Sequence, residues 1–233
     1  MARRADPDAR DRILDVASAL FASRGIGAVG MAEVVHDAGC GKNLLYTHFP
    51  SKGDLVAAHL ERFRRERDAA MDAAVTAAGD DPRAQLLALV RESGERVARP
   101  GFRGCPLRNF LTESPDVGGD GDTIARRFLA DSRERLARLV ARLGVAEPDV
   151  LTDRLALLVE GLYASAHDPR RAELGPAAVT FAEELVDAAR RGLTRLGPGD
   201  QAGAGAGRCS SRSRSSADLA RAPMTRATRR PPT

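Results

Sequence analysis

The stretch MAEVVHDAGCGKNLLYTHFPSK, residues 31–52, decides how this chain folds. Its first part carries apolar side chains at helical spacing, which predicts a short helix from Met31 to Ala38. Gly39, Cys40 and Gly41 then predict a turn, because glycine adopts left-handed backbone conformations at low cost. A second short helix is therefore expected to begin at Lys42.

The second short helix is predicted to place Leu45 and Phe49 against the first, since they are four residues apart. Its other faces carry polar and basic side chains. Pro50 ends it, and Ser51 is a suitable N-cap for a third helix that begins at Lys52. Two helices joined by a short glycine turn are typical of a helix-turn-helix, although an ordinary helical corner has the same spacing.

A series of residues before and within this stretch favours the helix-turn-helix: Ile13-Leu14-Asp15, Ala17, Leu20-Phe21, Arg24-Gly25, Ala38-Gly39, Leu45-Tyr46, His48-Phe49 and Ser51-Lys52. In this order they resemble the DNA-binding domain of the TetR/AcrR family of bacterial transcriptional regulators, over roughly residues 8–63. The resemblance implies an all-α protein. A three-helix helix-turn-helix DNA-binding domain (8–63) would be followed by a helical effector-binding and dimerisation domain (64–196).

The resemblance also implies which side chains meet DNA. Lys42 and Lys52 would contact phosphates, and Tyr46 and His48 would contact phosphate or sugar. Base edges would face Asn43, Leu44 and Thr47; an asparagine can pair with adenine and a leucine can contact a thymine methyl.

Three positions depart from the family's pattern. Gly30 stands where a serine or threonine usually caps the first short helix and touches phosphate, and Gly41 and Leu44 also replace hydroxyl residues. Gly30 and Gly41 are kept among the expected DNA-facing positions. The missing hydroxyls predict weaker backbone contacts or a different base preference, so the operator sequence is not predicted.

The remaining sequence predicts further helices and no strand-like alternation. Arg62, Arg64, Arg65 and Arg67 are expected to form a solvated face of a long helix. The segment 116–122 is expected to be a glycine-rich acidic loop, for which metal binding by Asp116, Asp120 and Asp122 is the weaker interpretation. The expected helical ranges are 5–24, 52–78, 82–100, a short helix after Pro106, 123–143, 149–167, and 177–196 starting after Pro176.

The last two helices are apolar around more of their circumference than a surface helix needs. A monomer would expose that apolar surface, whereas a second copy would bury it. Because the family dimerises through its last two long helices, we expect a homodimer formed by residues 149–196.

A ligand pocket is implied by the same resemblance, and the expected effector is a small apolar molecule. The predicted pocket residues are apolar or aromatic, and any helical core would contain such residues too. They are Phe102, Phe110, Leu111, Phe128, Leu158, Leu162 and Tyr163.

Charge and composition set the residues after 197 apart. The formal net charge is +4, but residues 198–233 hold seven arginines and two aspartates, so the rest of the chain sums to −1. The overall basicity is therefore weak evidence for nucleic-acid binding. Residues 197–233 are rich in Arg, Ser, Gly and Ala and are expected to be a disordered tail.

Other classes of protein are not supported by the sequence. Its three distant cysteines indicate a reducing compartment, and it has no apolar run long enough to span a membrane, so a cytoplasmic location without membrane contact is expected. No nucleophile–base arrangement, metal spacing or phosphate-binding loop suggests an enzyme, a metal site or a cofactor. The most favoured function is a ligand-responsive repressor; the alternatives are an activator on the same fold and a helical interaction adaptor that has lost specific DNA binding.

Overall fold

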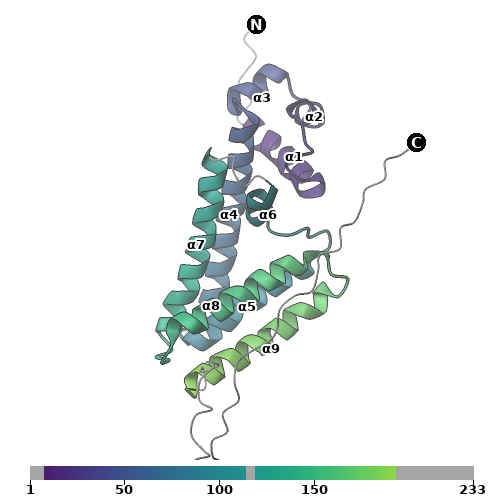
Figure 1. The fold of residues 1–233 in the computed structure, drawn as a ribbon. Helices are drawn as coiled ribbons and strands as arrows, with labels where there is room; N and C mark the ends of the chain where they lie inside the picture. The colour runs from purple at the N-terminus through teal and green to yellow at the C-terminus, as the bar shows by residue number, and fades with distance from the viewer. Residues whose placement is uncertain (1–7, 114–118, 193–233) are drawn as a thin grey trace, which may run out of the picture. The chain divides into compact units, whose positions relative to one another are not determined.

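The computed structural model describes residues 8–113 and 119–192, and within these ranges the chain is helical without strands. This confirms the all-α prediction. Figure 1 shows the arrangement of the helices. They are α1 (Ala9–Arg24), α2 (Met31–Asp37), α3 (Lys42–His48), α4 (Lys52–Ala77), α5 (Pro82–Ala98), α6 (Pro106–Glu113), α7 (Gly119–Ala141), α8 (Pro148–Ala164), the 3-10 turn η1 (Ser165–His167) and α9 (Arg171–Arg190).

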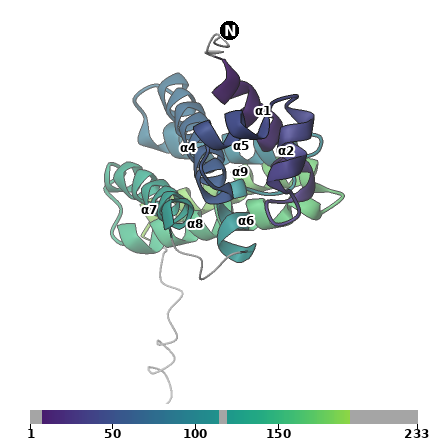
Figure 2. The same ribbon diagram turned by 90° about the horizontal axis from the view of Figure 1, so that it is seen from above.

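Helices α2 and α3 pack on α1 and on each other, and α1 packs on α4 (Figures 1 and 2). Their shared core consists of buried apolar side chains from all four helices. Leu45 and Phe49 are completely or almost completely buried in it, as predicted. The core residues are Ile13, Leu14, Ala17, Phe21, Val34, Leu45, Phe49, Leu55 and Leu60.

The two short helices have the bounds that the glycine and proline signals predict. The chain leaves α2 through Gly39, whose φ of 57° lies in the left-handed region. Gly41 is the N-cap of α3, and Pro50 follows its C-cap Phe49. The turn therefore places α3 across α2 with only four residues between them.

A reciprocal capping box fixes the start of α4. The Ser51 hydroxyl accepts a hydrogen bond from the Asp54 backbone N–H at 3.1 Å, and the Asp54 carboxylate accepts one from the Ser51 N–H at 2.9 Å. Both bonds satisfy N–H groups that have no partner within the helix. The predicted cap at Ser51 is confirmed.

The other described helices form the second half of the fold, in which α4 and α7 lie side by side and α5 packs along α9 (Figure 1). Gly94 and Gly175 lie where α5 meets α9. A β-carbon placed on Gly94 would come within 2.6 Å of the Gly175 α-carbon, so the two backbones touch. Only glycine permits such an approach without displacing a helix.

Two predicted boundaries are wrong. Helix α9 begins at Arg171, so Pro176 lies inside it rather than at its start. The proline removes the hydrogen bond to the Ala172 carbonyl; both residues are exposed, so water can replace the lost donor.

Residues 119–122 are the first turn of α7 and not part of a loop. Asp120 and Asp122 carry negative charge close to the helix N-terminus, which favours the helix. Gly121 is buried beneath the Phe110 ring, where a β-carbon would come within 2.9 Å of the ring.

Several predictions fall outside the described ranges. Asp116, the end of the last predicted helix (193–196) and the tail at 197–233 belong to this group. The predicted boundary between residues 63 and 64 lies in the middle of α4.

We predict that Ser51→Ala lowers the free energy of unfolding by about 1 kcal/mol, because an N-cap side chain is lost. Urea unfolding monitored by circular dichroism measures the change. Ser23→Ala is the matched control, since Ser23 is exposed and its hydroxyl only donates to the Leu20 carbonyl in the same helix. Equal stabilities for both variants would contradict the structural role of the cap.

Candidate nucleic-acid interface and ligand cavity

The outer face of α3 brings four of the predicted DNA-facing residues together. Lys42, Asn43, Tyr46 and Thr47 are all exposed on this helix, while Leu45 anchors it from below. Tyr46 is 39 % exposed, although most large aromatic side chains of the described residues are buried. The polar side chains of this face are therefore accessible to a binding partner such as DNA.

Contacts within the face order its side chains. The Lys42 ammonium lies 5.8 Å from the Tyr46 ring centroid, and the Thr47 hydroxyl donates a 2.8 Å hydrogen bond to the Asn43 carbonyl. Leu44 and His48 are half-buried at the edges of the face. These contacts limit the conformations that Lys42 and Thr47 must give up on binding.

Lys52 lies outside this face. It is half-buried, and its ammonium donates a 3.4 Å hydrogen bond to the carbonyl of Gly27 in the loop before α2. Gly30 and Gly41 are the N-caps of α2 and α3, and neither helix has a side-chain cap. A β-carbon at either glycine would meet no atom within 4 Å, so the missing hydroxyls are not excluded by packing.

Arg10, which the sequence did not single out, lies next to the interface. Its guanidinium is 5.1 Å from the Phe49 ring centroid, beside the C-terminus of α3. The contact joins residues 39 positions apart, and no local pattern in the sequence reveals it.

His59 connects α4 to α1 beneath the interface. It is 6 % exposed, its Nδ1 lies 2.9 Å from the Ser18 hydroxyl, and its ring meets the edge of Phe21 at 5.3 Å between centroids. Burial, and secondarily the positive charge of Arg62, lowers the pKa of His59 from 6.5 to about 4. The ring is therefore neutral at neutral pH.

A cleft of about 380 Å³ separates α1 from α6 and the loop that precedes it. Phe102 lines this cleft together with Phe21 and His59. Across it, Arg103 donates a hydrogen bond to the Ser23 carbonyl in α1. The loop before α6 therefore contacts α1 directly.

A second cavity, of about 60 Å³, lies among α4, α5, α6, α7 and α8. Of the seven predicted pocket residues, Phe128 and Tyr163 line it. Phe110 lines another hollow, near Lys52 and Gly121. Leu111, Leu158 and Leu162 line none of these three cavities, so the structure does not bring the predicted set together.

Two arginines in the second cavity were not predicted as site residues. Arg67 is 1 % exposed, which contradicts its assignment to a solvated face, and its Nη1 donates to Glu92 at 2.5 Å. Arg108 donates through Nε and Nη2 to Glu160, and its guanidinium lies 4.4 Å from the Tyr163 ring centroid. Burial alone would lower the pKa of Arg67, but Glu92 and Tyr163 outweigh it and raise that pKa above its ordinary value.

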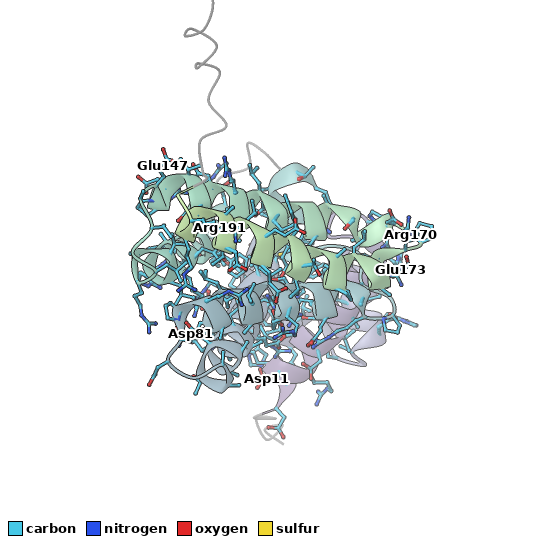
Figure 3. The ribbon with its side chains drawn as sticks, turned by 90° about the horizontal axis from the view of Figure 1, so that it is seen from below. Asp11, Asp81, Glu147, Arg170, Glu173 and Arg191 are labelled. Atoms are coloured by element: carbon cyan, nitrogen blue, oxygen red, sulfur yellow. The ribbon has the colours of Figure 1, made fainter. Side chains whose placement is uncertain are left out.

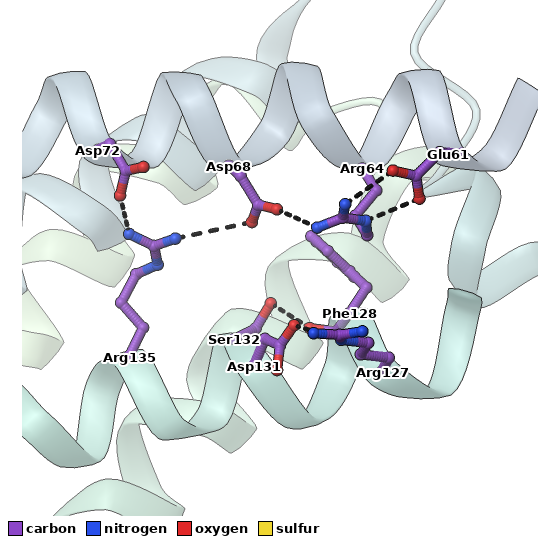
Figure 4. Close-up of polar contacts among 9 residues, drawn as sticks. All are labelled: Glu61, Arg64, Asp68, Asp72, Arg127, Phe128, Asp131, Ser132 and Arg135. Atoms are coloured by element: carbon purple, nitrogen blue, oxygen red, sulfur yellow. Dashed lines mark hydrogen bonds and ion pairs between the residues drawn. The ribbon is translucent and has the colours of Figure 1, made fainter. Parts of the chain in front are cut away.

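The other three members of the predicted solvated face lie elsewhere on α4. Arg65 is exposed, whereas Arg62 is half-buried and pairs with Asp11 and Asp15 of α1. Arg64 pairs with Glu61 and Asp68 (Figure 4).

An ion-pair network joins the cavity wall to α4. Figure 4 shows Arg135 of α7 reaching across to both Asp68 and Asp72, and Arg64 extending the network to Glu61. The Arg64 hydrogen bond lowers the pKa of Glu61 below its usual value. Because Arg135 also lines the cavity, this contact ties the cavity to the helix that follows the DNA-facing α3.

No described helix has the length and apolar character needed to cross a membrane. Within the described ranges, no group of His, Cys, Asp or Glu side chains could hold a metal ion. Asp122 instead pairs with Arg126 at 2.8 Å, one helical turn away.

A helix-turn-helix with an exposed polar second helix, continued by one long helix into a helical bundle with a cavity, is typical of helical DNA-binding regulators. The family described as "Bacterial regulatory proteins, tetR family" matches residues 13–59. Residues 13–59 therefore form a DNA-binding region of the tetR type, and the similarity to regulators of this family supports a role as a transcriptional regulator. The family resemblance seen in the sequence is thereby confirmed.

Individual relatives agree with this assignment. An uncharacterized HTH-type transcriptional regulator of Mycobacterium tuberculosis is 29% identical over 172 residues, which cover 71% of this chain and 78% of the relative. The HTH-type transcriptional repressor KstR2 of Rhodococcus jostii is 36% identical over 93 residues, 38% of this chain and 43% of that one. A crystal structure of a TetR-family regulator from Streptomyces coelicolor has the same fold: the TM-score is 0.74, with 24% identity, over 78% of this chain and 96% of that chain.

We predict that stability falls as the pH drops from about 6.5 toward 4. The unfolded chain protonates His59 near pH 6.5, whereas the folded chain does so only near pH 4, so protons favour unfolding in this window and the contribution is complete above it. The loss attributable to His59 between pH 7.5 and 5.5 is about 1 kcal/mol. Urea unfolding at both pH values measures it.

His59→Gln should be less stable at pH 7.5 but lose less stability on acidification than the native chain. His36→Gln is the control, because His36 is exposed on α2. An unchanged pH dependence in His59→Gln would contradict the assignment.

Proposed function

We propose that this regulator is a homodimeric repressor that leaves its operator when a small molecule enters the cavity among α4–α8. The observation that carries the proposal is that α4 belongs to both parts. Three residues separate it from α3, and further along it lines the cavity with Arg67 and Met71. As a DNA-binding regulator it would act in the cytoplasm.

In the proposed complex, α3 of each subunit lies in the major groove. Lys42 and Tyr46 contact the phosphate backbone, and Asn43 and Thr47 face base edges, since all four are exposed on one helix. Lys52 reaches a phosphate only if it releases the Gly27 carbonyl. His48, Leu44 and the backbones of Gly30 and Gly41 border this surface.

Dimerisation through α8 and α9 is supported by their exposed apolar side chains. The two helices run antiparallel side by side across one face (Figure 3). Leu157 on α8 is 70 % exposed and Phe181 on α9 is 50 % exposed. Burial of two such side chains from each subunit would stabilise the pair by several kcal/mol before the cost of association.

The link from cavity to DNA runs through α6 as well as α4. Arg108 on α6 lines the cavity, and the loop before α6 holds Arg103 against Ser23 of α1. A ligand that displaces α6 therefore also displaces the contact to the DNA-binding helices. Release requires that the ligand bind the DNA-free arrangement more tightly than the DNA-bound one.

The relatives include an activator, FasR of Mycolicibacterium smegmatis (45% identical over 53 residues), and the repressor KstR2; repression is favoured because the match to KstR2 extends over 93 residues. The cavity also has apolar walls, from Met71, Leu89, Phe128, Leu136 and Val159, which suit an effector with an apolar body. Activation and a DNA-independent adaptor are the alternatives. A reporter placed behind the operator distinguishes them: deletion of the regulator raises expression for a repressor, lowers it for an activator and leaves it unchanged for an adaptor.

The DNA-binding role is tested with a duplex from upstream of the chain's own gene and a scrambled duplex, titrated at two salt concentrations. Specific binding that weakens steeply with salt is expected. Asn43→Ala should lose about 1–3 kcal/mol on the specific duplex alone, because a base contact is lost. Lys42→Gln should weaken both duplexes and reduce the salt slope by about one per subunit. Binding without salt dependence would favour the adaptor.

We predict that Leu157→Arg and Phe181→Asp each produce monomers and weaken operator binding at least about tenfold, since one subunit contacts only one half-site. Analytical ultracentrifugation gives the oligomeric state. Ala130→Arg is the control, because it places a charge on an exposed position of α7 instead. Dimers that persist in both test variants would place the interface elsewhere.

A further inference from the structure

The small cavity among α4–α8 is more basic than an apolar effector requires. Its lining includes four arginines (Arg67, Arg108, Arg133 and Arg135) and one acidic residue, Glu160. Acidic side chains outside the lining form ion pairs with some of these arginines. Several guanidinium N–H groups nevertheless have no hydrogen-bond acceptor.

Three of these arginines have a buried N–H group without an acceptor. Among the described residues, Nε of Arg67 and Nη1 of Arg108 are buried and have no hydrogen-bond partner; Nε of Arg135 is in the same condition. Arg67 is almost wholly inaccessible, and a buried donor without an acceptor costs about 1–3 kcal/mol. Each guanidinium stays charged, because arginine does not deprotonate in proteins.

The acceptors already present leave these donors unpaired. Glu92 accepts from Arg67 through Oε1, which is also 3.7 Å from Nε of Arg96, whereas its Oε2 is buried and has no hydrogen-bond partner. Glu160 engages Nε and Nη2 of Arg108 and is half-exposed, which leaves Nη1 unused. A further anion would therefore find donors on two helices that face one cavity.

The size of the cavity limits that anion. About 60 Å³ is room for a few water molecules, which a carboxylate group fits and a nucleotide or coenzyme does not. A planar carboxylate also matches the fork of a guanidinium. The apolar side chains of Met71, Leu89 and Val159 lie in the same wall and would contact the first carbons of a hydrocarbon tail, whereas a longer tail requires the wall to open.

We propose that this cavity binds the carboxylate of a small amphiphilic acid, with Arg108 and Arg67 holding the head and the apolar wall holding the tail. The inference rests on the proposed ligand response and assigns the chemistry of the same site. The sequence predicts an apolar effector; the proposed ligand is an apolar molecule with a negatively charged end.

The probes are straight-chain carboxylic acids of two to twelve carbons and the primary alcohols of the same lengths. We expect at least one acid to raise the melting temperature of the native chain and to bind at least about tenfold more tightly than its matched alcohol, measured by calorimetry. Equal binding of the acid and its alcohol overturns the charged-head proposal. The absence of a shift with every acid, as expected if only water occupies the cavity, also overturns it.

Two substitutions should act in opposite directions. Arg108→Gln removes donors and should weaken acid binding at least about tenfold, whereas Glu160→Gln frees Arg108 and should strengthen it several-fold. Arg138→Gln is the control, because Arg138 is exposed on α7 and pairs only within its own helix, with Glu134. Acid binding that is the same in Arg108→Gln as in the native chain overturns the proposal.

Operator binding, measured with and without the acid, separates this inference from the proposed function. An acid that binds without changing operator affinity leaves the carboxylate site standing and removes its role as the effector site. An acid that binds and releases the operator supports both.

Discussion

One continuous helix belongs to both halves of this regulator, and the rest of the structure depends on it. The first turns of α4 contribute Leu55 and Leu60 to the core of the DNA-binding helices, and its later turns carry Arg67 and Met71 into the ligand cavity. A 26-residue helix spans about 39 Å and behaves as a stiff rod. A rigid helix therefore connects α3 to the cavity, and the capping box at Ser51 fixes the residue at which this helix begins.

Buried charge holds the helices of the second half in register. Exposed ion pairs such as that of Arg138 with Glu134 contribute less than about 1 kcal/mol each. Arg67 is different, because removing it would leave Glu92 buried with less compensation, at a cost of about 3–5 kcal/mol. The pair joins α4 to α5 through a directional contact, which apolar packing does not supply.

The sequence predicts local boundaries well where a residue has a strong backbone preference. Gly39, Pro50 and Ser51 locate α2, α3 and α4 almost to the residue, and the exposed face of α3 follows from Leu45 and Phe49. It predicts poorly where distant contacts decide. Arg67 lies in a run of arginines that indicates a solvated face, and only the packing of α5 and α7 against α4 buries it. The aromatic residues chosen for a pocket were distributed among separate hollows for the same reason.

The backbone contact between Gly94 and Gly175 determines how the outer helices can move. No side chain lies between α5 and α9 at that point that could change its conformation to absorb a movement. A shift of α5 toward α9 must therefore move α9 as well. Because the two backbones are already in contact, α9 cannot move closer to α5 at this point. Any larger residue at either position would push α5 and α9 apart and would tilt the face of α9 that carries Phe181. Two residues without side chains thereby set the mechanical stiffness of the outer layer.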